Sequence, residues 1–316
     1  MRTVVTGGAG FIGSAVVDQL VLRGDEVLVL DNLSTGSESN LEVAREIDES
    51  RVQLVVADIG ESGATELIAD YQPDVVFHLA AQADVRFSVV DPVTDAYTNV
   101  VGLLRVLEGA RVGNAHKVVF ASSGGTIYGE IESELLPLTE DIPKRPLSPY
   151  GVAKFAGGMY LDVYRSLHGL GGTALALANV YGPRQDPEGE AGVVAIFIKR
   201  LLAGQPCTIF GNGEQTRDFV YVNDVARAFI SAVNQADGML INIGTGVETS
   251  VNQLYKILAS EVGVTDLPKR MPVRSGELLR SSLDPARAHQ ELGWQASTTL
   301  GEGLKATLDW FASNRD

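Results

Sequence analysis

The sequence predicts an α/β fold in which a doubly wound parallel sheet, covered by helices on both faces, carries a smaller α/β lobe. Two observations lead to this prediction. Continuous Val, Leu and Ile runs alternate with amphipathic segments, which is typical of parallel strands buried on both faces. A glycine-rich turn also joins the first apolar run to the first helical segment. The 316 residues suffice for one large domain and a smaller lobe.

The predicted elements of the first half follow one another regularly. The segment "RTVVTG" is a short apolar run that ends in glycine, and "FIGSAVVDQLVLRG" carries apolar residues at helical spacing. A second buried strand is predicted at "EVLVLDN". The segments "VQLVVAD", "DVVFHLA" and "KVVFASS" repeat this pattern, with helical segments between them. We therefore expect five parallel strands in this part of the chain.

The second half follows a looser pattern. From "GTALALANV" onward the strands are shorter, and loops such as "YGPRQDPEGEAG" and "FGNGEQTRD" are rich in glycine, proline and charge. These features predict a second lobe that is interleaved with the end of the first. We expect residues 1–178 and about 214–246 to form the larger domain, and about 179–213 and 247–316 to form the smaller lobe.

Composition and charge exclude several classes of protein. The net charge of −15 and the pI of about 4.7 disfavour a nucleic-acid or anionic-membrane partner, because phosphates would be repelled. The single cysteine, Cys207, excludes an intramolecular disulfide, and the four histidines have no metal-ligand spacing, so no metal is expected. Because "MRTVVTGG" leads directly into a strand and no apolar run approaches about 18 residues, we expect a cytoplasmic protein.

The segment "TGGAGFIG" predicts a dinucleotide site. Gly7, Gly10 and Gly13 are spaced G-x-x-G-x-x-G between a predicted strand and a predicted helix. Glycines allow the backbone to approach a pyrophosphate, and the helix N-terminus offers free N–H groups and a partial positive charge. The strand, the turn and the helix together indicate a Rossmann-type arrangement.

Acidic residues at two strand ends extend this site. Asp31 ends the second predicted strand, eighteen residues after Gly13. A carboxylate there can accept hydrogen bonds from the adenosine ribose hydroxyls and would repel a 2′-phosphate, so NAD is favoured over NADP. Asp58, in "VVADI", suits a contact to the adenine edge and equally suits a turn.

The segment "SPYGVAK" supplies a candidate acid–base pair. Tyr150 and Lys154 are four residues apart and lie on one face of a predicted helix. A phenol has an ordinary pKa near 10, and a neighbouring ammonium favours the phenolate and lowers that pKa. The lysine can also hold a ribose hydroxyl. After a dinucleotide turn and a strand that ends in serine, this pair predicts proton transfer at a hydroxyl.

The chain resembles the extended short-chain dehydrogenase/reductases, and within them the nucleotide-sugar epimerase/dehydratase group. The resemblance covers residues 3 to about 284, nearly the whole chain, and its motifs occur in family order. These motifs are "TGGAGFIG", "LDNLSTG", "ADI", "VFHLAAQADVRFSVVDP", "TNVVG", "SSGGTIYG", "SPYGVAK", "ANVYGPRQ", "TRDFVYVNDVA", "NIGTG" and "RSGELLRSSLD".

The resemblance implies a set of NAD-lining residues, taken position by position from these motifs. The segment from Leu79 to Ala81 is expected to pass under the cofactor after the fourth strand. The full set of positions implied for NAD is Gly7, Gly10, Phe11, Ile12, Gly13, Asp31, Asn32, Asp58, Ile59, Leu79, Ala80, Ala81, Asn99, Tyr150 and Lys154.

The resemblance also implies anchors for the diphosphate of a UDP-sugar. Asn179 is expected to touch the phosphates, and Val193 and Val194 begin a helix whose N–H groups meet them. Arg217 and Arg274 are the expected cationic clamps, because the planar guanidinium fork matches phosphate oxygens.

Two further positions face the rest of the nucleotide sugar under the same resemblance. Glu277 is expected to accept hydrogen bonds from the UDP ribose. Arg86 follows the fourth strand near the expected sugar site, and its role is open.

The loop "FASSGGTIYGE" carries the hydroxyls nearest the expected chemistry. In the family a Ser or Thr at the end of the fifth strand binds the sugar O4. Counting from the strand gives Ser123, whereas counting back from Tyr128 leaves Ser123 and Gly124 in competition. We expect Ser123 to fill this role, with Thr126 as the second sugar-facing hydroxyl. The absence of a G-x-S-x-G elbow disfavours a hydrolase.

The same loop distinguishes reactions within the family. Dehydratases of the family carry an Asp-Glu pair here, and decarboxylases usually a Glu. This chain has Gly, Gly and Thr at the corresponding positions, and its first carboxylate, Glu130, lies beyond Tyr128. Dehydration and decarboxylation are therefore disfavoured.

The resemblance then implies NAD-dependent inversion at C4 of a UDP-hexose. Tyr150, held as phenolate by Lys154 and the nicotinamide charge, takes the C4 hydroxyl proton while Ser123 orients that hydroxyl. The C4 hydride passes to NAD, the 4-keto sugar turns about its diphosphate link, and the hydride returns to the other face.

The identity of the sugar stays open at this stage. Ser281 occupies the position that limits pocket width in hexose epimerases, and a small residue there leaves room for an N-acetyl group, so the substrates UDP-glucose and UDP-galactose could extend to their N-acetyl forms. A UDP-glucuronate 4-epimerase is the alternative, with Ser122, Ser123, Thr126 and Arg86 as donors to the carboxylate.

Two further expectations concern assembly and class. Family resemblance implies a homodimer formed through the helices that follow the fourth and fifth strands. A non-catalytic, redox-sensing dinucleotide protein would not need the pair of Tyr150 and Lys154, so we favour an enzyme.

Overall fold

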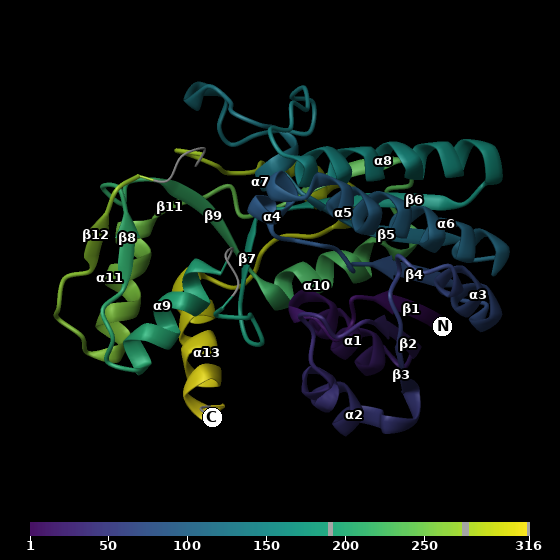
Figure 1. Cartoon of the computed structure of the whole chain (residues 1–316), viewed down its shortest axis with the longest axis horizontal. Coiled ribbons are helices and arrows are strands. Elements are labelled where there is room, and N and C mark those ends of the chain that lie inside the picture. The colour runs from purple at the N-terminus through teal and green to yellow at the C-terminus, as the bar shows by residue number, and fades with distance from the viewer. Residues whose placement is uncertain (189–191, 274–277, 315–316) are drawn as a thin grey trace.

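A seven-stranded parallel sheet forms the larger part of the protein (Figure 1). The computed structural model describes residues 1–188, 192–273 and 278–314. Every neighbouring pair in this sheet runs parallel, in the order β10-β6-β5-β4-β1-β2-β3. Its strands are β1 (Arg2–Thr6), β2 (Glu26–Asp31), β3 (Val52–Val56), β4 (Val75–His78), β5 (Lys117–Ser123), β6 (Gly171–Leu177) and β10 (Met239–Ile243).

Helices cover both faces of this sheet, as Figure 1 shows. Successive residues of β1 enter different cores: Val4 packs with α3, α6 and α8, and Val5 packs with α1 and α10. The helices around the large sheet are α1 (Phe11–Arg23), α2 (Glu42–Asp48), α3 (Gly63–Tyr71), α4 (Val85–Val90), α5 (Pro92–Ala96), the π-helical segment Tyr97–Val101, α6 (Gly102–Val112), α7 (Gly124–Ile127), α8 (Pro149–His168) and α10 (Val222–Ser231).

A smaller lobe stands beside the large sheet (left in Figure 1). It contains a three-stranded sheet in the order β11-β9-β7 and a two-stranded sheet of β12 and β8. Its elements are β7 (Asn179–Tyr181), α9 (Val193–Leu202), β8 (Thr208–Phe210), β9 (Thr216–Tyr221), β11 (Glu248–Ser250), α11 (Val251–Val262), β12 (Lys269–Met271) and α13 (Leu300–Ser313). The remaining helix, α12 (Ala286–Leu292), packs against β10 and α10 of the larger part.

A buried carboxylate joins the two parts. Asp218 on β9 is 1% exposed and accepts hydrogen bonds from the backbone N–H groups of Thr245, Gly246 and Leu283. The Thr245 hydroxyl adds a fourth donor at 2.6 Å. One side chain thereby fixes the turn after β10 and the C-terminal segment to the smaller sheet. Leu283 in turn pairs with Leu138 and packs against Gly124, at the end of β5.

The fold class predicted from the apolar runs is confirmed, since the five expected strands of the first half are β1 to β5 of one parallel sheet. Within residues 214–246, α10 packs on α1 and β10 joins the large sheet, whereas β9 pairs with β7 and β11. Among the described residues, no helix is both long and apolar enough to cross a membrane.

Candidate active site

The glycine turn after β1 is packed too closely for side chains. Gly7 has φ of +69°, and a Cβ on it would lie 2.6 Å from the backbone nitrogen of Ala80. A Cβ on Gly13 would collide with the Gly7 carbonyl oxygen. The turn therefore lies directly on the backbone that follows β4, and only glycine permits that approach.

Helix α1 begins beside this turn with its first N–H groups free of a side-chain cap. Its N-cap is Gly10, which brings no side chain to the helix end. The N–H groups of Phe11, Ile12 and Gly13 lie in the first turn, where the helix dipole adds a partial positive charge. This cradle fits a diphosphate, and it agrees with the dinucleotide expected from the sequence.

Asp31 stands at the end of β2 and is 7% exposed. One carboxylate oxygen accepts the Ala9 N–H at 2.9 Å, and the other accepts the Leu33 N–H at 2.8 Å. The side chain thus fixes the glycine turn from the neighbouring strand. Each oxygen keeps a second lone pair, so the same carboxylate can still accept ribose hydroxyls.

The expected adenine-side residues form a small group next to Asp31. Asn32 donates its side-chain amide to Asp58 at 2.8 Å, and the other Asp58 oxygen accepts the Gly60 N–H at 2.7 Å. Asp58 therefore stabilises a turn, which was one of its two predicted roles. Its contact to the adenine edge stays a prediction. Ile59 is buried against Gly102.

Side chains of α5 and of the π-helical segment hydrogen-bond the segment that follows β4. Leu79, Ala80 and Ala81 are partly buried, and the N–H groups of the first two donate to the Thr6 carbonyl. Asn99 is 4% exposed and closes a double hydrogen bond with the backbone of Gln82, donating at 2.9 Å and accepting at 3.0 Å. Asn99 therefore fixes the backbone position of the segment that is expected to lie beneath the cofactor.

Ser123, Tyr150 and Lys154 meet where β5 ends and α8 begins. The Ser123 side chain hydrogen-bonds the Tyr150 phenol. The Lys154 ammonium lies 5.6 Å from the centre of the Tyr150 ring and 5.0 Å from that of Phe120, and it donates to the Ala121 carbonyl at 2.9 Å. A hydroxyl, a phenol and an ammonium are thus gathered in one cluster, in which Lys154 is buried and Ser123 and Tyr150 are partly buried. This arrangement suits proton transfer to and from a substrate hydroxyl.

Burial has the largest effect on the pKa of Tyr150, and it acts against the lowering expected from Lys154. Burial raises the pKa of Tyr150 to about 12, the hydrogen bond from Ser123 opposes that shift, and the charge of Asp95 adds to it. Burial likewise lowers the pKa of Lys154 to about 8. The Lys154 ammonium donates to the Ala121 carbonyl, and the expected stabilisation of a Tyr150 phenolate by Lys154 together with the nicotinamide charge stays a prediction.

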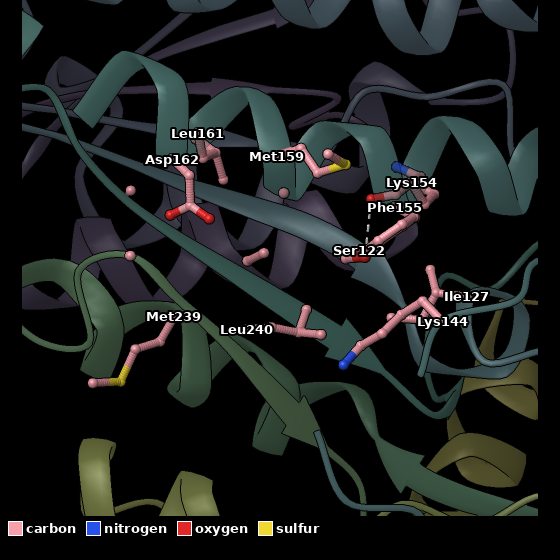
Figure 2. Close-up of a pocket in the computed structure, with 14 residues that line it drawn as sticks. Ser122, Ile127, Lys144, Lys154, Phe155, Met159, Leu161, Asp162, Met239 and Leu240 are labelled. Atoms are coloured by element: carbon pink, nitrogen blue, oxygen red, sulfur yellow. Dashed lines mark hydrogen bonds between the residues drawn. The ribbon is translucent and has the colours of Figure 1, made fainter. Parts of the chain in front are cut away.

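The hydroxyls of Ser122 and Thr126, on either side of Ser123, make different contacts. The Ser122 hydroxyl is buried and donates to the Lys154 carbonyl at 3.3 Å, as the dashed line in Figure 2 shows. Ser122 thus faces α8 and packs the helix on the sheet. Thr126 lies one turn of α7 after Ser123 and donates to the Ser123 carbonyl at 3.5 Å. Of the expected hydroxyls, Ser123 is therefore the one joined to Tyr150.

The pocket in Figure 2, of about 310 Å³, lies between α8 and the strands β6 and β10. Its lining is mainly apolar, with Phe155, Met159 and Leu240 on its walls. Neither Ser123 nor Tyr150 belongs to its described lining. Lys154 is the one member of the cluster that lines this described pocket.

The residues expected to hold the diphosphate come from the smaller lobe. Asn179 begins β7 opposite Phe219 of β9, so Arg217, two residues before Phe219, faces the same side of that sheet. Helix α9 begins at Val193 as predicted, behind Gly192, which offers no side-chain cap. Arg274 and Glu277 lie outside the described residues.

The remaining expected position, Arg86, lies in the first turn of α4, where its N–H donates to the Asp84 carboxylate at 2.7 Å. Its side chain is exposed.

Sequence reasoning missed two side chains of the site. Asp95 is fully buried and accepts hydrogen bonds from both Gln82 and Asn99. His78, also buried, hydrogen-bonds the Thr6 hydroxyl at 2.7 Å and stacks on Phe120. The spacing of Asp95 and Asn99, one helical turn apart, was the available signal, but it is also common on solvated helix faces.

Comparisons with known proteins agree with this geometry. A family model described as "NAD dependent epimerase/dehydratase family" matches residues 3–244. The UDP-glucose 4-epimerase of Mycolicibacterium smegmatis is 50% identical over 312 residues, which is 98% of each chain. A crystal structure of UDP-glucose 4-epimerase with UDP-glucose, from Thermotoga maritima, has a TM-score of 0.94 at 45% identity and covers 99% of each chain. The Thermus thermophilus UDP-glucose 4-epimerase, in complex with NAD, has a TM-score of 0.91 at 41% identity over 100% of both chains.

The buried His78 predicts a specific sensitivity to acid. Burial and the positive charge of Lys154 lower its pKa from 6.5 to about 3. Below about pH 6.5 the histidine of the unfolded chain binds a proton, whereas buried His78 stays unprotonated until the pH approaches 3. The contribution of neutral His78 to the free energy of unfolding is therefore complete above pH 6.5 and is lost as the pH falls toward 3. We expect His78→Gln to flatten the decline of unfolding free energy between pH 6.5 and 4, by up to about 1.4 kcal/mol per pH unit.

Urea denaturation of both proteins across this range measures the effect. The control is His289→Gln, which changes an exposed histidine on α12 and should leave the slope unaltered. Equal slopes for wild type and His78→Gln would contradict the assignment.

Proposed function

The chain belongs to the NAD dependent epimerase/dehydratase family, and on that premise we propose that it interconverts UDP-glucose and UDP-galactose by inverting C4. The observation that carries this proposal is the cluster of Ser123, Tyr150 and Lys154 at the carboxyl edge of the sheet, the same edge that carries the glycine turn. The UDP-glucose 4-epimerases named above share the fold over nearly the full chain and support this choice.

The residues present fit NAD. The proposed contacts are the glycine turn and the α1 N-terminus for the diphosphate, Asp31 for the adenosine ribose, and the segment from Leu79 to Ala81 beneath the cofactor. When bound, NAD would take the hydride from C4 and return it to the opposite face, and its nicotinamide charge would favour the phenolate. The protein supplies orientation and the proton acceptor.

Tyr150 is the proposed acceptor and donor of the C4 hydroxyl proton. Its phenol is already hydrogen-bonded to Ser123, so a substrate hydroxyl placed between the two would be oriented and deprotonated at one position. The Lys154 ammonium, 5.6 Å from the phenol ring, is the protein's own positive charge at this point. Because burial raises the pKa of Tyr150 to about 12, the phenolate requires such charges nearby.

The smaller lobe is the proposed anchor for the UDP group. Arg217 and Asn179 face one side of the sheet of β7 and β9, and the α9 N-terminus at Val193 begins nearby in sequence. Arg274 and Glu277 are proposed from their motif alone. An anchored diphosphate would leave the sugar free to turn between the two half-reactions.

We propose that the sugar site beside Ser123 and Tyr150 also accepts an N-acetyl group. Ser281 is small and 7% exposed, and it lies two residues before Leu283, which packs against Gly124 beside Ser123. Its neighbourhood therefore borders the reacting hydroxyls. With no carboxylate at Gly124, Gly125 or Thr126, the loop offers no acid–base pair for dehydration.

The division into domains is likewise a proposal. We assign residues 1–178 and about 214–246 to NAD binding, and about 179–213 and 247–316 to the nucleotide sugar. The position of β10 in the large sheet supports the interleaving, and β9 marks the strand at which the two parts join.

A homodimer is proposed through the helices after β4 and β5. On α8, Val152, Met159, Val163 and Leu167 are exposed and recur at seven- and four-residue intervals along one side. Exposed valines on α4 and α5 lie on elements that pack against α8. Burying such an apolar face against a second copy of the chain is more favourable than leaving it exposed to water.

Tyr150→Phe should abolish turnover and keep the cofactor. Removal of the phenolic oxygen removes the proton acceptor, and general acid–base groups contribute about 10²–10⁴-fold in rate. The measurements are conversion of UDP-galactose to UDP-glucose and the NAD content of the purified variant. Tyr160→Phe, on the same helix, is the matched control and should stay active. Turnover near wild type in Tyr150→Phe would exclude this residue as the base.

The substrate choice is tested with UDP-galactose, UDP-GalNAc and UDP-glucuronate. We expect turnover of the first two and none of the third. Ser281→Tyr should reduce kcat/KM for UDP-GalNAc about tenfold or more while sparing UDP-galactose, because a large side chain fills the N-acetyl space. Exclusive turnover of UDP-glucuronate would instead establish the alternative epimerase.

Light scattering tests the proposed dimer. We expect a mass of twice 33.6 kDa for the wild type. The double variant Met159→Glu/Val163→Glu places charges on the apolar side of α8 and should give a monomer. Leu22→Glu changes an equally exposed apolar residue on α1 and should leave the dimer intact. A monomeric wild type would refute the proposal.

A further inference from the structure

Asp95 on α5 is a buried carboxylate with an incomplete set of partners. Its side chain has no exposed surface. One oxygen accepts hydrogen bonds from the Gln82 amide at 3.0 Å and the Asn99 amide at 2.9 Å. Among the described residues, the other oxygen has no hydrogen-bond partner. Burial of such a group is costly unless an opposite charge lies close by.

Helix α8, which carries Lys154, packs against α5. Asp95 lines a cavity of about 440 Å³ together with Ser148, Pro149, Val152 and Ala153. These residues flank Tyr150 and Lys154 in the sequence, so the carboxylate lies against the first turns of the helix that carries both. Lys154 is 4% exposed and equally needs a counter-charge.

We propose that Asp95 is a positioning residue whose negative charge keeps the buried Lys154 in its ammonium form, while its hydrogen bonds to Gln82 and Asn99 hold the segment after β4. The proposal rests on the function proposed above, in which Lys154 acts as a cation beside Tyr150. It adds a fourth side chain to that cluster, one that touches neither the sugar nor the reacting proton.

The electrostatics of the cluster support this assignment. Burial lowers the pKa of Lys154 to about 8, and the Asp95 charge opposes that shift. Conversely, burial raises the pKa of Asp95, and the Lys154 charge lowers it. His78, on β4, also interacts with Lys154. The other charged or titratable groups on the packed helices are Asp84 and Arg86 at the start of α4, Asp91 at the start of α5, and Asp162, Arg165 and His168 toward the end of α8.

One negative charge acts on both members of the acid–base pair in the same direction, because Asp95 also raises the pKa of Tyr150. Its removal should therefore move the two limbs of the pH–kcat profile together toward lower pH. A side chain that only supported the fold would lower kcat evenly at every pH. The shape of the profile separates these two roles.

The direct test is the titration of Lys154 by NMR of lysine-labelled protein, with Lys154→Met used to assign its signal. In Asp95→Asn the midpoint should fall by about one pH unit, which is a tenfold loss of proton affinity. Asp91→Asn is the matched control, since it removes a charge from the same helix and keeps a residue suited to capping. Its midpoint should equal that of the wild type.

The titration of Lys154 does not require turnover, so a lowered or an unchanged midpoint in Asp95→Asn can be interpreted whatever substrate the enzyme uses. An unchanged midpoint in Asp95→Asn would overturn the proposal and leave the proposed function standing. Should Asp95→Asn not fold, the reciprocal measurement applies: the Asp95 carboxyl signal must titrate at higher pH in Lys154→Met than in the wild type. No such displacement would equally overturn it.

Discussion

The site depends on the close approach of the glycine turn to the backbone that follows β4. A Cβ at Gly7 would lie 2.6 Å from the Ala80 nitrogen, so the two segments can touch only because that position has no side chain. Since β1, β4 and β5 are parallel neighbours, their carboxyl ends meet at one edge of the sheet. The cradle for a diphosphate and the hydroxyl of Ser123 therefore lie at the same edge, two strands apart.

Burial, more than pairing, sets the protonation of this edge. Burial raises the pKa of Tyr150 and lowers the pKa values of His78 and Lys154. Each group has lost hydration that its few neighbours only partly replace. A cluster of this kind responds strongly to any single charge added or removed nearby, and this sensitivity gives the carboxylate of Asp95 its importance.

The sequence predicted the parts of the fold that local pattern controls. Unbroken Val and Leu runs indicated the parallel strands, and the spacing of Gly7, Gly10 and Gly13 located the turn, because both properties depend on residues adjacent in the chain. The three-residue strand β7 and its pairing with β9 depend on contacts between distant segments, which periodicity does not record. The same reason hid Asp218, whose four donors come from residues 245–283.

The electrostatics of the site were out of reach for a related reason. The spacing of Tyr150 and Lys154 correctly placed both side chains together, but spacing does not record burial, which raises the pKa of Tyr150. Motif order supplied most of the remaining candidate positions. Asp95 could not be singled out, since an acid in a helix is ordinarily solvated, and only the packing of α5 on α8 shows that it is buried.

The contact between Gly124 and Leu283 also bears on how this enzyme could diverge. A carboxylate at position 124, where a related enzyme of different chemistry would carry one, requires a Cβ that would collide with the Leu283 side chain. Leu283 cannot easily yield, because it is 1% exposed and its backbone is bound to Asp218. A new acid in the loop would thus need a matching change more than 150 residues away in the chain. The two positions would have to evolve together, and single substitutions at either one alone would first pass through a less stable protein.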